Sequence, residues 1–217
     1  NLASYINKNH SIDVLTIADY VDLSESNEFD SRQQFFIKRF KRFKAPFVTY
    51  LIRIIELLIR MNKNDYTHCL LSGRFSLWMT LIIRYILLNN RIRLIAILHG
   101  SELRPKNQLF KFLLSKSLKK VNLIISVSRF TEGLIPREIK DITKLIIPNG
   151  IDLIKFNVNN IKKIIRLRGN PCFLTIGSLT ARKGQINFIN IMPSILVQYP
   201  NAHYHCFGLK LEEKNIL

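Results

Sequence analysis

A loop between a predicted strand and a predicted helix carries two adjacent cations. Cys172–Ile176 is a short apolar run typical of a buried strand, and residues 186–197 have the apolar periodicity of a helix. The connecting loop contains Gly177, Ser178, Arg182, Lys183 and Gly184. The first N–H groups of a helix lack intrahelical partners and favour an anion, and the two cations add positive charge. The pattern predicts a phosphate or diphosphate site; the alternative is an ordinary turn with two solvated cations.

A second motif precedes this loop. Residues 145–152 read LIIPNGID, and the order PNGID, strand, G-x-L-x-x-x-K-G and helix resembles the middle of the retaining glycosyltransferases of family 4, which have the GT-B fold. In that family the PNG-[IV]-D segment marks the crossing from the N-terminal to the C-terminal Rossmann-like domain. The resemblance therefore assigns the interdomain crossover to Asn149, Gly150 and Asp152.

The resemblance also gives the cationic loop a specific ligand. In this family a G-R-L-x-x-x-K-G loop holds the diphosphate of a nucleotide-sugar donor. Gly177, Leu179, Lys183 and Gly184 match that pattern. Ser178 stands where an arginine is usual, and Arg182 is placed to supply the cation from a shifted position, so the departure bears on donor affinity and not on the fold. The implied donor-diphosphate site consists of Gly177, Ser178, Arg182 and Lys183.

Strands and helices alternate along the whole chain, which favours an α/β fold with parallel sheets. The expected strands are 12–17, 66–71, 92–98, 123–127, 144–147, 172–176 and 202–207, and the expected helices are 2–9, 76–88, 108–119, a helix from Arg129 capped by Ser128, and 186–197. Residues 19–30 are polar and acidic and are expected to form a loop, and residues 161–168 a basic helix or linker.

By resemblance, the fold is GT-B-like. Residues 1–150 would form the N-terminal, acceptor-side Rossmann-like domain, 151–170 a crossover linker, and 171–217 the beginning of the nucleotide-sugar donor domain. A helix that runs directly into the strand at 12–17 is the second half of a βαβ unit, whose first strand is central in a doubly wound sheet. That strand and the family's E-x(7)-E segment are not in the sequence, so we expect the chain to be a fragment.

Two polar residues follow the predicted strand that ends at Leu98. Ligands of open α/β sheets bind beyond the carboxyl ends of the strands, which is where His99 and Glu102 lie. The sequence HGSE resembles the H-G-x-[DE] segment of many family members, in which the histidine lines the cleft near the transferred sugar and the acceptor. The resemblance makes His99 and Glu102 the candidate catalytic residues. The alternatives are a histidine that only bonds a neighbouring loop and a glutamate that caps or pairs near Arg104.

The chain is strongly basic, with 33 Lys and Arg residues, 15 Asp and Glu residues and a formal net charge of +18. Basic and aromatic residues interleave with helical spacing over residues 31–63. The residues expected to face a membrane are Lys38, Arg39, Phe40, Lys41, Arg42 and Phe43. Such a segment can lie on anionic lipid, stack on single-stranded nucleic acid, or be a surface helix whose rings face the core. No nucleic-acid motif accompanies it, so we expect no nucleic-acid partner.

Cysteine and histidine spacing gives no cofactor motif. Cys69, Cys172 and Cys206 are far apart, which fits a reducing compartment. His203 and His205 share one strand face, but no third metal ligand is evident, and two ordinary strand residues are the simpler interpretation. We therefore expect no metal and no cofactor. No run of about 20 uncharged apolar residues, as a transmembrane helix requires, is present.

The function that the resemblance implies is transfer of a sugar from a nucleotide-sugar donor to a glycan or lipid-linked acceptor, with retention of configuration, by a hexosyltransferase-type enzyme. The basic aromatic segment favours polysaccharide or lipopolysaccharide assembly by a cytoplasmic protein peripheral to the inner face of the plasma membrane. The alternative is a non-catalytic basic module that binds membrane or nucleic acid, or an inactive remnant of a glycosyltransferase.

Overall fold

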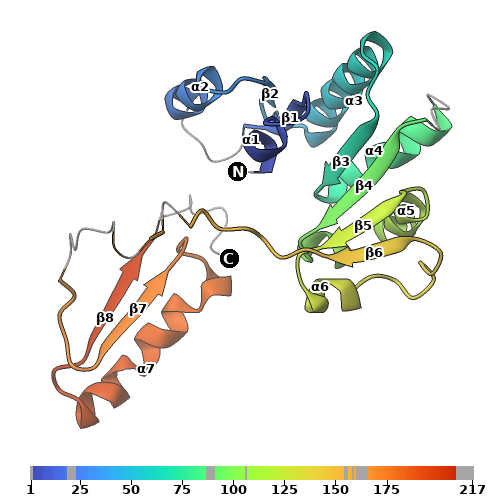
Figure 1. The fold of residues 1–217 in the computed structure, drawn as a ribbon. Helices are drawn as coiled ribbons and strands as arrows, with labels where there is room; N and C mark the ends of the chain where they lie inside the picture. Colours follow the sequence, from blue (N-terminus) through green and yellow to red (C-terminus); the bar gives the residue numbers. More distant parts are fainter. Residues whose placement is uncertain are drawn as a thin grey trace. The chain divides into compact units, whose positions relative to one another are not determined.

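The chain divides into two compact units, Asn1–Gly150 and Ile151–Leu217 (Figure 1). The computed structural model describes residues 2–18, 23–86, 91–105, 107–153, 156–157, 159 and 166–208. Within these residues every pair of hydrogen-bonded strands is parallel. The α/β class with parallel sheets, predicted from the alternation of elements, is confirmed.

The first unit contains a two-stranded and a four-stranded sheet. The strands are β1 (Asp13–Ile17) and β2 (Phe36–Phe40) in one sheet, and β3 (His68–Ser72), β4 (Arg93–Leu98), β5 (Leu123–Ser126) and β6 (Thr143–Ile146), in that order, in the other. The helices are α1 (Leu2–Ile6), α2 (Leu23–Ser31), α3 (Pro46–Lys63), α4 (Arg74–Tyr85), α5 (Gln108–Leu118) and α6 (Arg129–Gly133), with the short 3-10 turn η1 (Ser101–Leu103). The expectation of a further, central strand stays a prediction.

The main core lies on the four-stranded sheet. Leu94, Ala96 and Leu98 alternate along β4 and are fully buried, as the two-residue period of a strand requires. They pack with residues of α4 and α5 such as Ile83 and Leu118, and Figure 1 shows these two helices beside the sheet. This buried face fixes the positions at which the strands end, and therefore the loops that follow them.

Side-chain caps begin two of the helices where the sequence places polar residues. The Leu109 N–H donates to Oδ1 of Asn107 at the start of α5 (2.8 Å), and the Thr131 N–H donates to Oγ of Ser128 at the start of α6 (3.1 Å). These bonds satisfy amide groups that have no intrahelical partner. The predicted Ser128 cap is confirmed.

Two local predictions are wrong. Residues 19–30 were expected to be a loop, but the described part contains α2. The helical spacing seen from residue 31 onwards holds only for α3, because residues 36–40 form β2, which pairs with β1. The reason is tertiary: Arg39 in β2 pairs with Asp30 in α2 through two hydrogen bonds of 2.7 and 2.8 Å, which sequence periodicity cannot reveal.

The change from helix to strand alters the residues expected to face a membrane. Phe40 is only 4% exposed, so its ring belongs to the core and not to a membrane-facing surface. Lys38 and Arg39 are held in ion pairs with Glu56 and Asp30. Lys41, Arg42 and Phe43 follow β2 and are exposed, and their contact with lipid stays a prediction.

An ionic network attaches α3 to the strands. Arg60 donates to Glu56 and to Asp13 of β1 (2.7 Å each), and Tyr66, just before β3, donates its hydroxyl to the same Asp13 carboxylate (2.6 Å). Lys38 donates to the other oxygen of Glu56 (2.6 Å). The network therefore ties β1, β2, α3 and the start of β3 together.

The network predicts acid-sensitive stability. The hydrogen bond from Lys38, with a further one from Arg60, lowers the pKa of Glu56 below its usual value, although desolvation opposes the shift. Because the folded pKa is depressed, this stabilisation is complete above the unfolded pKa of about 4.3 and is lost as the pH falls through the folded value. We expect the urea midpoint of the wild type to fall more steeply than that of Glu56→Gln between pH 5 and pH 3, about the range of carboxylate titration. Equal slopes would contradict the ion-pair assignment.

The second unit is a βαβ arrangement. It contains β7 (Cys172–Ile176), the 3-10 turn η3 (Ala181–Lys183), α7 (Gln185–Gln198) and β8 (His203–Phe207), and β7 pairs with β8. Phe188 of α7 packs against Phe173 of β7 and Tyr204 of β8, with ring centroids 5.1 and 4.3 Å apart. Figure 1 shows α7 running along this strand pair. The predicted strand, loop, helix and strand are confirmed.

Candidate functional site

Three neighbouring parallel strands of the first unit end in polar residues at one edge of the sheet. Ser72 is the last residue of β3, His99 follows β4, and Ser128 follows β5. Because parallel strands present their carboxyl ends at the same edge, these residues gather there. This edge is where an α/β sheet binds its ligand.

The His99 side chain is exposed at this edge. Its Nε2 atom lies 3.2 Å from Oγ of Ser72, so the imidazole is oriented by a hydroxyl from the neighbouring strand. The Arg74 guanidinium at the start of α4 donates to the Ser101 carbonyl oxygen (3.5 Å). Sequence reasoning missed Ser72 and Arg74, although the end of the predicted strand before Gly73 marks the same sheet edge.

Glu102 lies beneath the loop and is buried, with 3% of its surface exposed. Its Oε1 accepts the His99 backbone N–H (2.6 Å), and its Oε2 accepts the Ser101 hydroxyl (3.3 Å). The structure therefore brings the two candidate catalytic residues together, but the Glu102 carboxylate is occupied by the loop itself. This geometry suits a residue that positions His99 and not one that touches a substrate.

Gly100 allows the loop to fold tightly. Its φ of 108° lies in a region that favours glycine, and a Cβ atom at this position would lie 3.4 Å from Oγ1 of Thr131. Thr131 in turn contacts the Ser128 hydroxyl (3.1 Å). The β4 loop and the start of α6 are consequently packed together at Gly100, the residue after His99.

The cationic loop of the second unit folds back on itself. Gly177 has a φ of 146°, and its N–H donates to the Phe207 carbonyl oxygen (2.8 Å). The side chain of Lys183 lies over Gly177, because a Cβ atom built there would be 3.7 Å from the lysine Nζ. Among the residues that the structure describes, no carboxylate pairs with Lys183. The ammonium group is thus placed beside the loop backbone with its charge available.

Helix α7 begins at Gln185, two residues after this lysine. Gly184 precedes it with φ 74° and ψ 12°, the left-handed conformation, and the first turn of the helix contains no acidic residue. Gln185 is buried, and its Nε2 donates to the Ser178 carbonyl oxygen (3.2 Å). Oε1 of Gln185 and Oγ1 of Thr180 are buried without a hydrogen-bond partner in the described part of the chain. Buried oxygens of this kind normally accept a hydrogen bond from a protein group or from an ordered water.

Arg182 lies in η3, but its side chain is outside the described part of the structure, so its contribution to the loop stays a prediction. The division between the compact units falls between Gly150 and Ile151. Asn149, Gly150 and Asp152 are exposed and belong to no helix or strand. Their role as a crossover is likewise a prediction. Most of the expected basic helix or linker at 161–168 lies outside the described residues.

The two histidines of β8 are bonded to the main chain. Nδ1 of His203 lies 3.1 Å from the Asn201 carbonyl oxygen, and Nε2 of His205 lies 2.8 Å from that of Arg168. Across the described ranges, no three His, Cys, Asp or Glu side chains are grouped so that they could hold a metal ion. No helix among those same residues is long and apolar enough to cross a bilayer.

Comparison with known families identifies the class of protein. The sequence model of Glycosyltransferase Family 4 matches residues 1–155, more than half of the chain, and the chain belongs to this family. The match covers the sheet edge that carries Ser72, His99 and Glu102, and the parallel α/β architecture is consistent with a Rossmann-like GT-B fold. A search of curated proteins returned no match. Family membership gives the chain a glycosyltransferase function, with a sugar donor and an acceptor as substrates.

Proposed function

We propose that this protein is a retaining, hexosyltransferase-type enzyme that uses a nucleotide-sugar donor and binds the donor diphosphate at the loop from Gly177 to Gly184. The observation that carries the proposal is the placement of Lys183 over Gly177 at the start of α7. The N-terminus of α7, the Lys183 ammonium group and the Thr180 hydroxyl can each donate a hydrogen bond to a diphosphate oxygen. This chemistry supports an anionic ligand better than a neutral one.

The same groups suit the chemistry of donor cleavage. When the bond between the sugar and the diphosphate breaks, negative charge develops on the leaving diphosphate, and fixed positive charge beside it lowers the barrier. In the proposal Lys183, joined by Arg182, supplies that charge, and neither a divalent metal nor a cofactor is required. Ser178 would contribute its backbone to the loop in place of the usual arginine.

On the acceptor side, the proposal gives His99 a contact with the sugar or the acceptor and makes Glu102 its positioning residue. The exposed imidazole at the carboxyl edge of β4 supports the first role, and the buried carboxylate on the His99 N–H supports the second. The acceptor is a glycan or a lipid-linked glycan of polysaccharide or lipopolysaccharide assembly, used at the cytoplasmic face of an anionic membrane. Exposed cations such as Lys41 and Lys44 support the membrane location.

Donor binding is tested by calorimetric titration of the whole chain with UDP and with GDP. We expect Lys183→Ala to weaken binding of the preferred diphosphate by about 10- to 100-fold, since a hydrogen bond to a charged group contributes about 1.5–3 kcal/mol. The matched control is Arg166→Ala, an exposed cation in the same unit but outside the loop. Binding that both variants weaken equally, or that neither weakens, would refute the proposed site.

A further inference from the structure

Helix α3 turns an apolar face outward. Phe47, Leu51, Ile55 and Ile59 recur every fourth residue, and they are 69%, 53%, 47% and 45% exposed. Residues four apart are neighbours on a helix surface, so these side chains form one continuous stripe, which Ile52 widens. We call these five residues the outer face of α3. Contiguous exposed apolar surface of this kind marks an interaction site.

Arg53, Glu56 and Arg60 of α3 lie away from the outer face. The Arg53 guanidinium is 4.8 Å from the Phe75 ring centroid and donates to Oγ of Ser76 (3.2 Å). Glu56 and Arg60 belong to the ionic network with β1 and β2. A surface helix normally turns its charges to water and its apolar side chains to the core. In α3 these three charges face the protein, and the stripe that faces outward is apolar.

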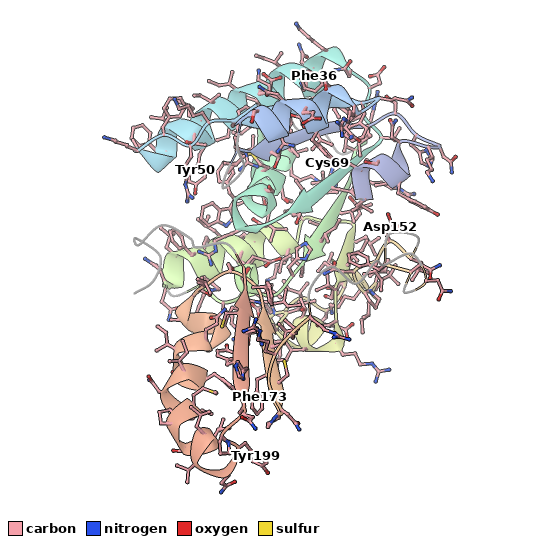
Figure 2. The ribbon with its side chains drawn as sticks, turned by 90° about the vertical axis from the view of Figure 1, so that its left-hand side faces the viewer. Phe36, Tyr50, Cys69, Asp152, Phe173 and Tyr199 are labelled. Carbon is pink, nitrogen blue, oxygen red and sulfur yellow. The ribbon has the colours of Figure 1, made fainter. Side chains whose placement is uncertain are left out.

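Contacts with the core hold α3 in this orientation. The Tyr50 ring stacks on Phe75 of α4, with centroids 4.0 Å apart, and Tyr50 is labelled in Figure 2 where α3 approaches that helix. Ile54, Leu57 and Met61 pack against the main core. Rotating the helix to bury its outer face would break these contacts together with the ion pairs. The exposure of the outer face is therefore built into the fold.

Positive charge borders the outer face. Lys41 and Lys44 are exposed in the segment that leads into α3, and Lys63 lies in its last turn. The sequence of α3 holds one acidic residue, Glu56, and its charge is matched by Lys38 and Arg60. The surface therefore combines apolar side chains with exposed cations, which is the composition that binds the acyl chains and headgroups of an anionic bilayer.

We propose that the outer face of α3 is the membrane-docking surface of this protein, with its apolar side chains in the interfacial layer and Lys41 and Lys44 on anionic headgroups. The inference deepens the proposed function, on which it rests for a membrane-linked acceptor. It also replaces β2 as the element in contact with lipid, because Phe40 of β2 is buried. An apolar protein partner would need no flanking cations, so the charge favours lipid.

The test measures partitioning of the whole chain onto vesicles by co-sedimentation. The vesicles contain either phosphatidylcholine alone or equal parts of phosphatidylcholine and phosphatidylglycerol. We expect Leu51→Ser/Ile55→Ser to weaken binding to the anionic vesicles about 100-fold, since each exposed aliphatic side chain contributes about tenfold. Lys41→Gln/Lys44→Gln is expected to weaken it by about 10- to 30-fold, with little effect on the neutral vesicles.

Matched controls separate a specific surface from general stickiness. Leu109→Ser/Phe112→Ser removes two exposed apolar side chains from α5, and Lys111→Gln/Lys140→Gln removes two exposed cations elsewhere. Both controls should bind anionic vesicles as the wild type does. Circular dichroism verifies that every variant is folded, which is expected because all the substituted side chains are exposed.

The outcomes distinguish this inference from the proposed function. The docking surface is overturned if the wild type does not bind anionic vesicles. It is also overturned if the α3 variants lose no more binding than the control variants, even if the outer face of α3 then binds a protein. If the chain binds UDP or GDP in that case, the proposed donor site is still supported. Vesicle binding that depends on α3, together with no nucleotide binding, supports the docking surface and refutes the donor site.

Discussion

Leu94→Ala is expected to lower the free energy of unfolding by about 2–5 kcal/mol. Leu94 is fully buried on β4, which lies between β3 and β5 in the four-stranded sheet. The Leu94 backbone is fixed on both sides of its Cα atom. Its N–H donates to Oδ1 of Asn122, and its carbonyl oxygen accepts the Asn122 N–H (2.8 Å each). The sheet therefore cannot collapse to fill the cavity, which places the cost of truncation in the upper part of this range.

Urea unfolding followed by circular dichroism measures this loss. The control is Leu109→Ala on α5, where the side chain is 58% exposed and truncation should change stability by about 0.5 kcal/mol or less. A similar cost for the two substitutions would show that the β4 side chains do not form the core described for this unit.

Glu102→Ala is expected to free the loop that carries His99. The substitution leaves the His99 N–H without its buried acceptor, at a cost of about 1–3 kcal/mol, and removes a constraint on the loop that carries His99. Exchange of the His99 amide hydrogen should accelerate by about 10- to 100-fold at constant pH. The reason is that the lost hydrogen bond lowers the free energy needed to open the loop locally. Hydrogen exchange read residue by residue is the measurement.

The isosteric variant separates positioning from charge. Glu102→Gln keeps an oxygen that can accept the His99 N–H, so it should restore most of the amide protection that Glu102→Ala loses. If Glu102→Ala leaves exchange at His99 unchanged, the loop does not depend on this carboxylate. In that case the positioning role proposed for Glu102 fails.

Elements with a clear internal period were predictable from the sequence. The run RLIAIL predicts strand β4, in which alternate residues are buried against α4 and α5. Ser128 predicts the start of α6, because its hydroxyl caps that helix. The glycine and lysine spacing after β7 located the loop in which Lys183 covers Gly177. In each case the determining interactions are local or follow directly from burial.

Elements that depend on distant partners were not predictable. Strand β2 has charged residues at Lys38 and Arg39, and their ion-pair partners, Glu56 and Asp30, come from other elements that the sequence pattern does not place beside β2. The outward direction of the α3 stripe also depends on tertiary contacts, since its spacing alone fits a helix that faces the core. The same limit applies to Glu102, whose carboxylate is turned under the loop by the His99 N–H.

The most direct test of donor binding is an amide chemical-shift map of the labelled chain titrated with UDP and with GDP. A diphosphate on the loop should shift the amide resonances of Gly177, Ser178, Gly184 and the first turn of α7. In Lys183→Ala the same shifts should need about 10- to 100-fold more nucleotide, as expected for the loss of a charged hydrogen bond. If neither nucleotide shifts these resonances, or the shifts gather on the basic residues around Lys41 instead, the loop does not hold the donor and the proposed function fails.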